Sequence, residues 1–329
     1  MENNGEWEVI DEGNVTSRHE NSFVECRGKL YLIGGRGDRP VEEYNPDSNT
    51  WRRLSNPPFE IHHFQAVAYN GLIYIAGAMT DSERGFPFEK PVENVLIYDP
   101  EQNSWSKGPE IPQGRRRGSC GAFVYHDRLY MLGGIIEGHN TGSVTWFDRY
   151  DFSTDTWSIL PDCPRGRDHF QAIVVDNRLY AIGGRDTSFH KNEKGEYEFS
   201  AFFGATIREV DVYDFTKEEY FVGKKVHKET PWRTLAERLP VGTAAGSIVS
   251  IRETIYYIGG ESNQQNAHSE TQCLDIHTQK WQFDAPLQTG RHGTSALEYK
   301  GSIYIASGSG GKGGGPELSS LERYRLNDS

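Results

Sequence analysis

A short apolar run with a central tyrosine and a closing pair of small residues recurs six times along the 329-residue chain. It reads Lys-Leu-Tyr-Leu-Ile-Gly-Gly at 29–35 and Leu-Ile-Tyr-Ile-Ala-Gly at 72–77. The tyrosine lies three residues before the first small residue in every copy: Tyr31, Tyr74, Tyr130, Tyr180, Tyr256 and Tyr304. Self-similarity of this kind indicates an array of one structural unit, and it therefore constrains the whole fold before any local pattern does.

Each repeat predicts four short antiparallel strands. An apolar strand such as 64–69 is followed by a turn pair, for example Asn70-Gly71, Asp176-Asn177 or Lys300-Gly301, and then by the tyrosine run. Such pairs supply the positive φ that two-residue hairpin loops need. A third strand ends at an aromatic residue, and a fourth begins at a tryptophan seven residues later: Tyr44/Trp51, Tyr98/Trp105 and Tyr150/Trp157.

Three repeats depart from this pattern in informative ways. Leu274 replaces the tyrosine but keeps the seven-residue spacing to Trp281. Tyr213 lies nineteen residues before Trp232, so the turn between Lys217 and Pro231 is about twelve residues longer than in the other repeats. The last repeat has Tyr324 without a following tryptophan, and its missing partner is Trp7 at the other end of the chain. We therefore expect residues 6–10 to complete the last sheet, which closes a ring and removes the open edge of a linear array.

This pattern of apolar strand, glycine pair, tyrosine and tryptophan resembles the kelch repeat over nearly the whole chain. The departures are Gly77-Ala78 and Ser307-Gly308 in place of Gly-Gly. The resemblance implies an all-β, six-bladed β-propeller of four-stranded blades, with the N-terminal strand completing blade 6. It also implies a single domain over residues 1–329, in which the repeated tyrosines and tryptophans pack between blades.

Composition narrows the class of protein. The net charge is −12, which disfavours nonspecific binding of nucleic acid, because polyanions are attracted by a basic field. No run reaches the roughly 18 apolar residues of a membrane span, so we expect no membrane partner. The four cysteines, at 26, 120, 163 and 273, lack metal-site spacing and indicate free thiols. With no signal segment at Met1, the expected location is cytoplasmic, or periplasmic or secreted if a signal peptide was removed.

The connections into the first strand of each repeat carry the clearest functional signal. Thirteen residues before the six tyrosines lie Arg18, Ile61, Arg117, Arg167, Thr243 and Arg291. The next aligned position holds His19, His62, Gly118, Asp168, Ala244 and His292, and the one after holds Glu20, His63, Ser119, His169, Ala245 and Gly293. The first strand is innermost in a propeller, so these residues are predicted to ring the mouth of the central channel.

The loops between second and third strands add polar residues to the same face. They contain Arg36, His139, Arg185, Glu261 and the glycine-rich stretch 308–315. The loop of blade 4, from Arg185 to about Arg208, is the longest and carries four aromatic residues: Tyr197, Phe199, Phe202 and Phe203. Such a loop is suited to act as a lid or a partner surface, or it is a tolerated insertion.

Arginines at this face suggest an anionic ligand, because the guanidinium fork matches a carboxylate or phosphate bidentately. The alternative is that each arginine bridges adjacent blades by binding backbone carbonyls. The predicted ligand-binding set comprises Arg18, His19, Arg36, His62, Arg117, His139, Arg167, Arg185, Glu261, Arg291 and His292.

Histidines from two blades give the site a possible chemistry. His63 and His169 belong to identical, in-phase His-Phe-Gln-Ala segments, and with Glu20 they are the candidate acid/base residues. A metal site is the other use, with His62, His63 and His169 as candidate ligands. The sequence shows no evident cofactor, and it leaves a divalent metal open.

Two function classes fit these features. The first is binding, and processing, of an anionic, carboxylated carbohydrate. The chain is similar in blade number and rim residues to the sialic acid mutarotases, and propeller-fold lyases of uronate polymers are a related option. The second is a non-enzymatic interaction module that binds acidic peptide segments of a protein partner. A deep pocket closed by the blade-4 loop would favour the first class, and a wide, shallow mouth the second.

Overall fold

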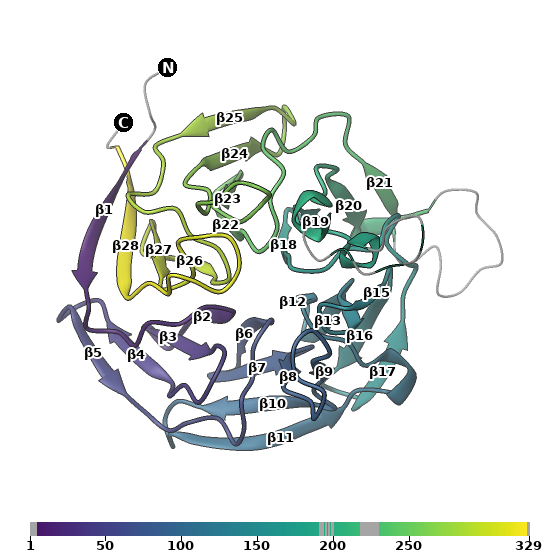
Figure 1. The fold of residues 1–329 in the computed structure, drawn as a ribbon, viewed down its shortest axis with the longest axis horizontal. Helices are drawn as coiled ribbons and strands as arrows, with labels where there is room; N and C mark the ends of the chain where they lie inside the picture. Colours follow the sequence, from purple (N-terminus) through teal and green to yellow (C-terminus); the bar gives the residue numbers. More distant parts are fainter. Residues whose placement is uncertain are drawn as a thin grey trace.

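The computed structural model describes residues 5–190, 194, 196, 198, 201–217 and 230–327. Six four-stranded antiparallel sheets stand in a ring around a common axis (Figure 1), and residues from all six blades line a small cavity at the centre, here called the channel. The predicted six-bladed all-β propeller is confirmed, and no α-helix occurs among the described residues. No helix in that part of the chain is long and apolar enough to cross a membrane.

The strands of each blade follow one another from the channel outward. Blade 1 comprises β2 (Asn21–Cys26), β3 (Lys29–Gly34), β4 (Glu42–Asn45) and β5 (Thr50–Arg53). Blade 2 comprises β6 (Gln65–Tyr69), β7 (Leu72–Ala76), β10 (Asn94–Asp99) and β11 (Ser104–Glu110). Blade 3 comprises β12 (Gly121–Val124), β13 (Arg128–Leu132), β16 (Phe147–Asp151) and β17 (Thr156–Ile159).

The second half of the ring follows the same plan. Blade 4 comprises β18 (Gln171–Val175), β19 (Arg178–Ile182), β20 (Asp211–Asp214) and β21 (Trp232–Thr234). Blade 5 comprises β22 (Ser247–Ile251), β23 (Thr254–Ile258), β24 (Thr271–Asp275) and β25 (Trp281–Asp284). Blade 6 comprises β26 (Ala296–Tyr299), β27 (Ser302–Ala306), β28 (Ser320–Leu326) and β1 (Gly5–Glu12).

The tyrosine and tryptophan repeats set the register of the outer strands. The predicted pairs face each other directly across the third and fourth strands in all six blades: Tyr44–Trp51, Tyr98–Trp105, Tyr150–Trp157, Tyr213–Trp232, Leu274–Trp281 and Tyr324–Trp7. These contacts lie within one blade. Packing between blades comes from the buried clusters that join neighbouring sheets, such as the one that contains both Tyr31 and Tyr98.

The ends of the chain close the ring as the sequence predicts. Strand β1 pairs antiparallel with β28, and the two strands lie side by side in blade 6 (Figure 1). Trp7 is buried, packs against the ring of Tyr324 at 5.4 Å, and donates its indole N–H to Thr271 Oγ1 of blade 5 at 3.0 Å. Closure therefore links the first strand to two blades.

Turn chemistry explains why the hairpins form where they do. At the turn between β6 and β7, Asn70 and Gly71 both adopt positive φ (49° and 76°). Asp176 and Asn177 do the same between β18 and β19. This is the conformation that two-residue loops require.

Additional structure lies on the face where the second strands end. Two short ribbons occur there, β8 (Met79–Thr80) with β9 (Lys90–Pro91), and β14 (Ile135–Glu137) with β15 (Thr141–Ser143). The blade-4 loop contributes the 3₁₀ turns η2 (Thr187–His190) and η3 (Ala201–Gly204). Two further turns, η1 (Gln113–Arg115) and η4 (Phe215–Lys217), lie elsewhere. Tyr197, Phe199 and residues 218–229 of the predicted long turn lie outside the described residues.

Candidate functional site

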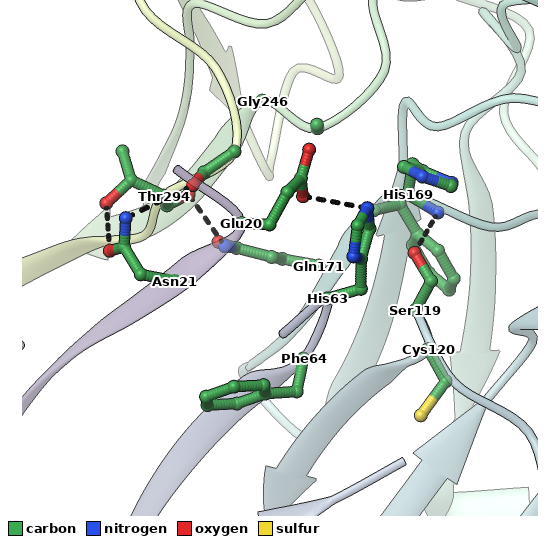
Figure 2. Close-up of a pocket in the computed structure, with 13 residues that line it drawn as sticks. Glu20, Asn21, His63, Phe64, Ser119, Cys120, His169, Gln171, Gly246 and Thr294 are labelled. Carbon is green, nitrogen blue, oxygen red and sulfur yellow. Dashed lines mark hydrogen bonds and ion pairs between the residues drawn. The ribbon is translucent and has the colours of Figure 1, made fainter. Parts of the chain in front are cut away.

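The innermost residues form a closed ring of hydrogen bonds around the channel. At the third aligned position, Glu20, His63, Ser119, His169, Ala245 and Gly293 all adopt positive φ between 50° and 66°. Each is linked to the next blade: five of the six links are backbone N–H to carbonyl bonds, and the sixth runs from the amide of His169 to Ser119 Oγ. The ring fixes the backbone of these six residues, so that the side chains of Glu20 and His63 meet beside the channel (Figure 2).

A cup with a volume of about 380 Å³ lies above this ring. The residues that line it come from the first-strand connections and from loops of several blades: His19, Glu20, Arg36, Phe86, His139, Arg185, Phe202, Phe203, Glu261, Gly313 and Gly314. A smaller cavity of about 30 Å³ lies in the channel, lined in part by Glu20, His63 and His169, with room for one or two waters. Glu20 borders both spaces, so it marks the floor of the cup.

Three histidines gather at this floor. His63, His139 and His169 are buried, and each offers a ring nitrogen within 4.8 Å of the other two. The Nε2 atoms of His139 and His169 lie 3.0 Å apart, and the ring centroid of His63 lies 4.9 Å from each of theirs. The sequence predicts His63 and His169 as a pair, and the structure adds His139 to them from the β14–β15 connection.

Each histidine of this cluster contacts a carboxylate. His169 Nδ1 lies 2.5 Å from Asp168 Oδ1, His139 Nδ1 lies 3.1 Å from Glu89 Oε1, and His63 Nε2 lies 3.2 Å from Glu20 Oε2. Asp168 also accepts hydrogen bonds from the hydroxyls of Thr187 and Ser143. Glu89 is held by Arg36 at 2.6 Å.

Burial and these partners shift the pKa values in opposite directions. Burial lowers the pKa of His169 to about 4 and the pKa of His63 well below its ordinary value, so both imidazoles are neutral at pH 7. Burial alone would raise the pKa of Asp168, but hydrogen bonding to His169 and the charge of Arg185 bring it to about 2. The pKa of Glu89 is lowered in the same way by His139 and Arg36, against the effect of burial. The floor therefore combines the neutral imidazoles of His63 and His169 with ionised carboxylates.

The four aligned arginines do not line the cup. Arg18, Arg117, Arg167 and Arg291 are at most 1% exposed. Arg117, for example, donates to the carbonyl oxygens of Gly133 and Met131 and forms an ion pair with Asp148 at 2.6 Å. The backbone trace of the first strand starts at the mouth as predicted, but the long side chains run outward between the strands of their own blade.

The carboxylate partners of these arginines also occur at a fixed position in the repeat, which an alignment of the first strand alone does not show. They lie two residues before the repeated aromatic of the third strand, as Glu42, Asp148, Asp211 and Glu322. Blades 2 and 5, which have Ile61 and Thr243 in place of arginine, have Leu96 and Gln272 at that position. Arginine and acid are therefore present together or absent together, which identifies the arginines as part of the scaffold.

The remaining predicted residues divide between the cup and its surroundings. Arg185 is buried in the cup wall, where it forms an ion pair with Glu261 at 2.6 Å. His19 lines the cup and contacts Glu317 at 2.7 Å. The Nε2 atom of His292 lies 2.9 Å from the carbonyl oxygens of Gly311 and Gly313.

His62 lies beside the cluster, outside the cup. Its Nδ1 is 2.6 Å from Nδ1 of His63, and its Nε2 is 3.6 Å from Glu60. Together with Glu60 and Asp81 it forms a second group of potential metal ligands among the described residues. Sequence reasoning missed Glu89 and Phe86, because the β8–β9 loop that carries them has no counterpart at a fixed position in the other repeats.

Comparisons with known proteins agree with this architecture. The family model for the KLHDC2/KLHL20/DRC7 Kelch-repeats domain matches residues 2–184, more than half of the chain. Kelch-like protein terF of Aspergillus terreus is 27% identical over 92% of this chain and 64% of its own length. Alpha-scruin of Limulus polyphemus is 32% identical over 51% of this chain and 19% of its own length. The chain thus spans less than two thirds of each of these relatives.

A solved structure, titled "Structure of YjhT", is similar to this chain with a TM-score of 0.76. The similarity covers 98% of both chains at 16% sequence identity, so it bears on the fold alone. The repeat pattern, the six closed blades and the match of the family model agree with one another, and the chain belongs to the kelch-repeat family.

Proposed function

We propose that this kelch propeller binds a small carboxylated ligand of carbohydrate size in the cup, and that the histidines of the floor exchange protons with it. The observation that carries the proposal is the cup itself, which has an aromatic wall and is lined by His139 and Glu20, with His63 and His169 on the adjoining channel cavity that Glu20 also borders. Its volume of about 380 Å³ falls in the range typical of small-molecule sites, roughly 300–1,000 Å³.

The walls suit a ligand that has one apolar face and several polar groups. Phe202 and Phe203 come from the blade-4 loop, and Phe86 stands at the rim with 52% of its surface exposed. Sugar rings present C–H groups that pack on aromatic faces, while their hydroxyls bond to imidazole and carboxylate groups. Because the blade-4 loop supplies part of the wall, the cup matches the deep-pocket expectation better than the wide-mouth one.

Arg36 is the cup arginine that is placed to meet a ligand carboxylate. Its side chain is 24% exposed, whereas that of Arg185 is 1% exposed and bound to Glu261. Glu89 engages one of its terminal guanidinium nitrogens, and a planar guanidinium offers five N–H donors. A carboxylated ligand would therefore approach the floor from the side of Arg36.

The neutral histidines are in the unprotonated form, which can accept a proton, at neutral pH. Because His63 and His169 are buried and uncharged, each can accept a proton from a bound ligand, and a protonated partner can return it. Glu20 is the carboxylate in contact with His63 that would stabilise the resulting imidazolium. These three residues are the proposed acid/base set.

A thermal-shift panel tests the binding proposal. The protein is melted with sialic acid, uronates, neutral sugars and acidic peptides, with Arg36→Gln and the matched control Arg39→Gln. Arg39 is similarly exposed and contacts Glu317, but it does not line the cup. A ligand at 100 times its Kd stabilises by about 2.7 kcal/mol. We expect carboxylated sugars to raise the Tm of wild type and Arg39→Gln more than that of Arg36→Gln. Equal shifts in the two variants would contradict the proposal.

The alternative is an interaction module for acidic peptide segments, and the exposed Phe86 at the rim favours it. An aromatic residue half exposed beside a cavity is typical of partner surfaces. In the same panel, stabilisation by acidic peptides that is lost in Phe86→Ser, with no response to sugars, would replace the first proposal with this one.

A further inference from the structure

We propose that His63, His139 and His169 bind one divalent first-row transition-metal cation, such as Zn²⁺, at the floor of the cup. The three ring nitrogens lie within 4.8 Å of one another and come from three blades. His63 and His169 are held on the innermost hydrogen-bonded ring, and His139 reaches them from the β14–β15 connection. Three protein ligands and one open position are typical of catalytic zinc sites.

The hydrogen bonds behind two of the histidines determine which nitrogen carries the proton. The Nδ1 atoms of His169 and His139 face the ionised carboxylates of Asp168 and Glu89, which only accept hydrogen bonds. In this arrangement each imidazole donates from Nδ1 to its carboxylate, which leaves Nε2 as the nitrogen that faces the other histidine. Carboxylates behind ligand histidines are the usual second shell of a metal site.

The two lone pairs then face each other at a distance that a metal explains. His139 Nε2 and His169 Nε2 are 3.0 Å apart. Two such acceptors repel unless a cation stands between or above them. Nitrogens bound to one tetrahedral Zn²⁺ at about 2.0–2.1 Å lie roughly 3.3 Å apart, close to the observed separation. An additional proton shared by the pair is the other way to satisfy this geometry.

The charges around the floor favour a divalent cation over a single proton. Glu89 is paired with Arg36, and Glu261 with Arg185. Glu20 and Asp168 are also buried, and Asp168 has only a long ion pair of 3.9 Å with Arg185, which is already paired with Glu261. Two surplus buried carboxylates are balanced by one divalent ion, because a buried charge requires a nearby partner.

The imidazole ligands determine which metals can bind. The position of the site beside the cup determines what the bound ion can contact. Imidazole nitrogens suit Zn²⁺, Cu²⁺, Ni²⁺ or Fe²⁺, whereas Mg²⁺ and Ca²⁺ prefer oxygen ligands. His139 lines the cup, so the open coordination position faces the space in which a ligand carboxylate would bind. The inference rests on the proposed function only for the binding of a carboxylated ligand beside the metal. A histidine nitrogen that binds the metal has no lone pair left to accept a proton, so in the metal-bound protein this role replaces proton transfer by these histidines. Binding of the metal itself is measured without any organic ligand.

Titration of the full chain with Co²⁺ and Zn²⁺ after removal of metals by a chelator tests the site. Co²⁺ reports coordination through its d–d absorption bands, and calorimetry gives the stoichiometry. We expect one equivalent per chain in wild type and loss of the bands in His139→Ala. Glu89→Gln and Asp168→Asn should retain binding with about 10–100-fold lower affinity, the usual effect of removing a second-shell partner.

Two control variants separate this cluster from other groups on the same face. His268→Gln removes a buried histidine that contacts Ser262 and Glu270. Asp81→Asn disables the second group, formed by Glu60, His62 and Asp81. Both should bind Co²⁺ like wild type. The proposal is overturned if wild type binds no metal, if folded His139→Ala binds as wild type does, or if Asp81→Asn abolishes the signal. Stabilisation of the metal-free protein by carboxylated sugars, without metal binding, would overturn this inference and leave the proposed function intact.

Discussion

The residue in the third aligned position has the same backbone conformation in every blade but a different side chain. Five of the six are non-glycine residues with positive φ, a conformation that costs about 1–2 kcal/mol at each. Glu20, His63, Ser119 and His169 follow one another on one arc of the ring, and Ala245 and Gly293 complete it. The functional groups of the innermost ring are thus gathered on one side of the channel.

The four cysteines are expected to be unreactive in the folded protein. All are buried, and burial raises the pKa of Cys26, Cys120 and Cys163 to about 11 and that of Cys273 to about 12. Since the thiolate is the reactive form, iodoacetamide at pH 8 should leave the native mass unchanged and modify all four thiols in urea. Modification of the folded protein, seen by mass spectrometry, would contradict this.

The carboxylate of Glu261 should make the free energy of unfolding of the protein depend on pH in the acid range. Burial alone would raise its pKa, but His292 and Arg185 bring it to about 2, below the ordinary 4.5. A carboxylate with a lowered folded-state pKa contributes stability above the unfolded pKa, and this contribution is lost as the pH falls toward the folded pKa. Between pH 5 and pH 2 the loss should be roughly 3 kcal/mol.

Urea denaturation of wild type and Glu261→Gln across this pH range measures the effect. The wild-type midpoint should fall more steeply with acid than that of the variant. The exposed Glu137→Gln serves as the control and should follow wild type. Parallel profiles for wild type and Glu261→Gln would show that this carboxylate is not the source of the pH dependence.

At the scale of the element, the buried arginine and carboxylate pair joins three strands of one blade. In blade 1, Arg18 precedes β2, binds the carbonyl oxygen of Gly34 at the end of β3 at 3.0 Å, and contacts Glu42 of β4 at 2.5 Å. Burial lowers the pKa of Arg18 to about 10, which leaves it charged at neutral pH. Blade 2 has Ile61 and Leu96 at the equivalent positions and keeps the same sheet, so an apolar pair is an adequate substitute.

The stability losses caused by replacing Arg18 and Glu42 in blade 1 should therefore not be additive. Removing one partner leaves a buried charge without compensation, so Arg18→Ile or Glu42→Leu alone should cost about 3–5 kcal/mol. The double variant, which copies blade 2, should be more stable than either single variant. Denaturation midpoints complete the double-mutant cycle, and additive losses would contradict the interpretation.

At the scale of the whole molecule, one N-terminal strand closes the ring. Without β1, the edge of β28 would be open, and exposed edges promote association between chains. Trp7→Ala should cost about 3–5 kcal/mol, because it removes a large buried ring and its hydrogen bond to Thr271. The control Val9→Ser changes a residue of the same strand that is 42% exposed. Melting and size-exclusion chromatography compare the two, and equal behaviour would exclude a closing role for Trp7.

The fold was predictable because every blade repeats the same local information. The tyrosine run, the turn pairs and the tryptophan spacing each specify strand order and register, and Trp7 indicated the closure. The candidate site was predictable only in part. His63, His169 and Glu20 are in phase with the repeat, so alignment places them on the innermost ring.

His139 and Glu89 belong to loops whose length varies from blade to blade, and only the folded chain brings them to the floor of the cup. The arginines show a different limit of prediction from the sequence. Alignment gives the position of their Cα atoms correctly, but it does not give the direction of a long side chain. The matching acid two residues before each repeated aromatic, such as Glu42 before Tyr44, contains that information.

The central claim is that the histidine cluster at the floor of the cup binds a metal ion. A crystal structure of the protein soaked in Zn²⁺, with anomalous diffraction data at the zinc edge, tests this claim most directly. We predict one strong anomalous peak within bonding distance of ring nitrogens of His63, His139 and His169, with its open side toward the cup. An empty cluster, or a peak only at Glu60, His62 and Asp81, would contradict the account.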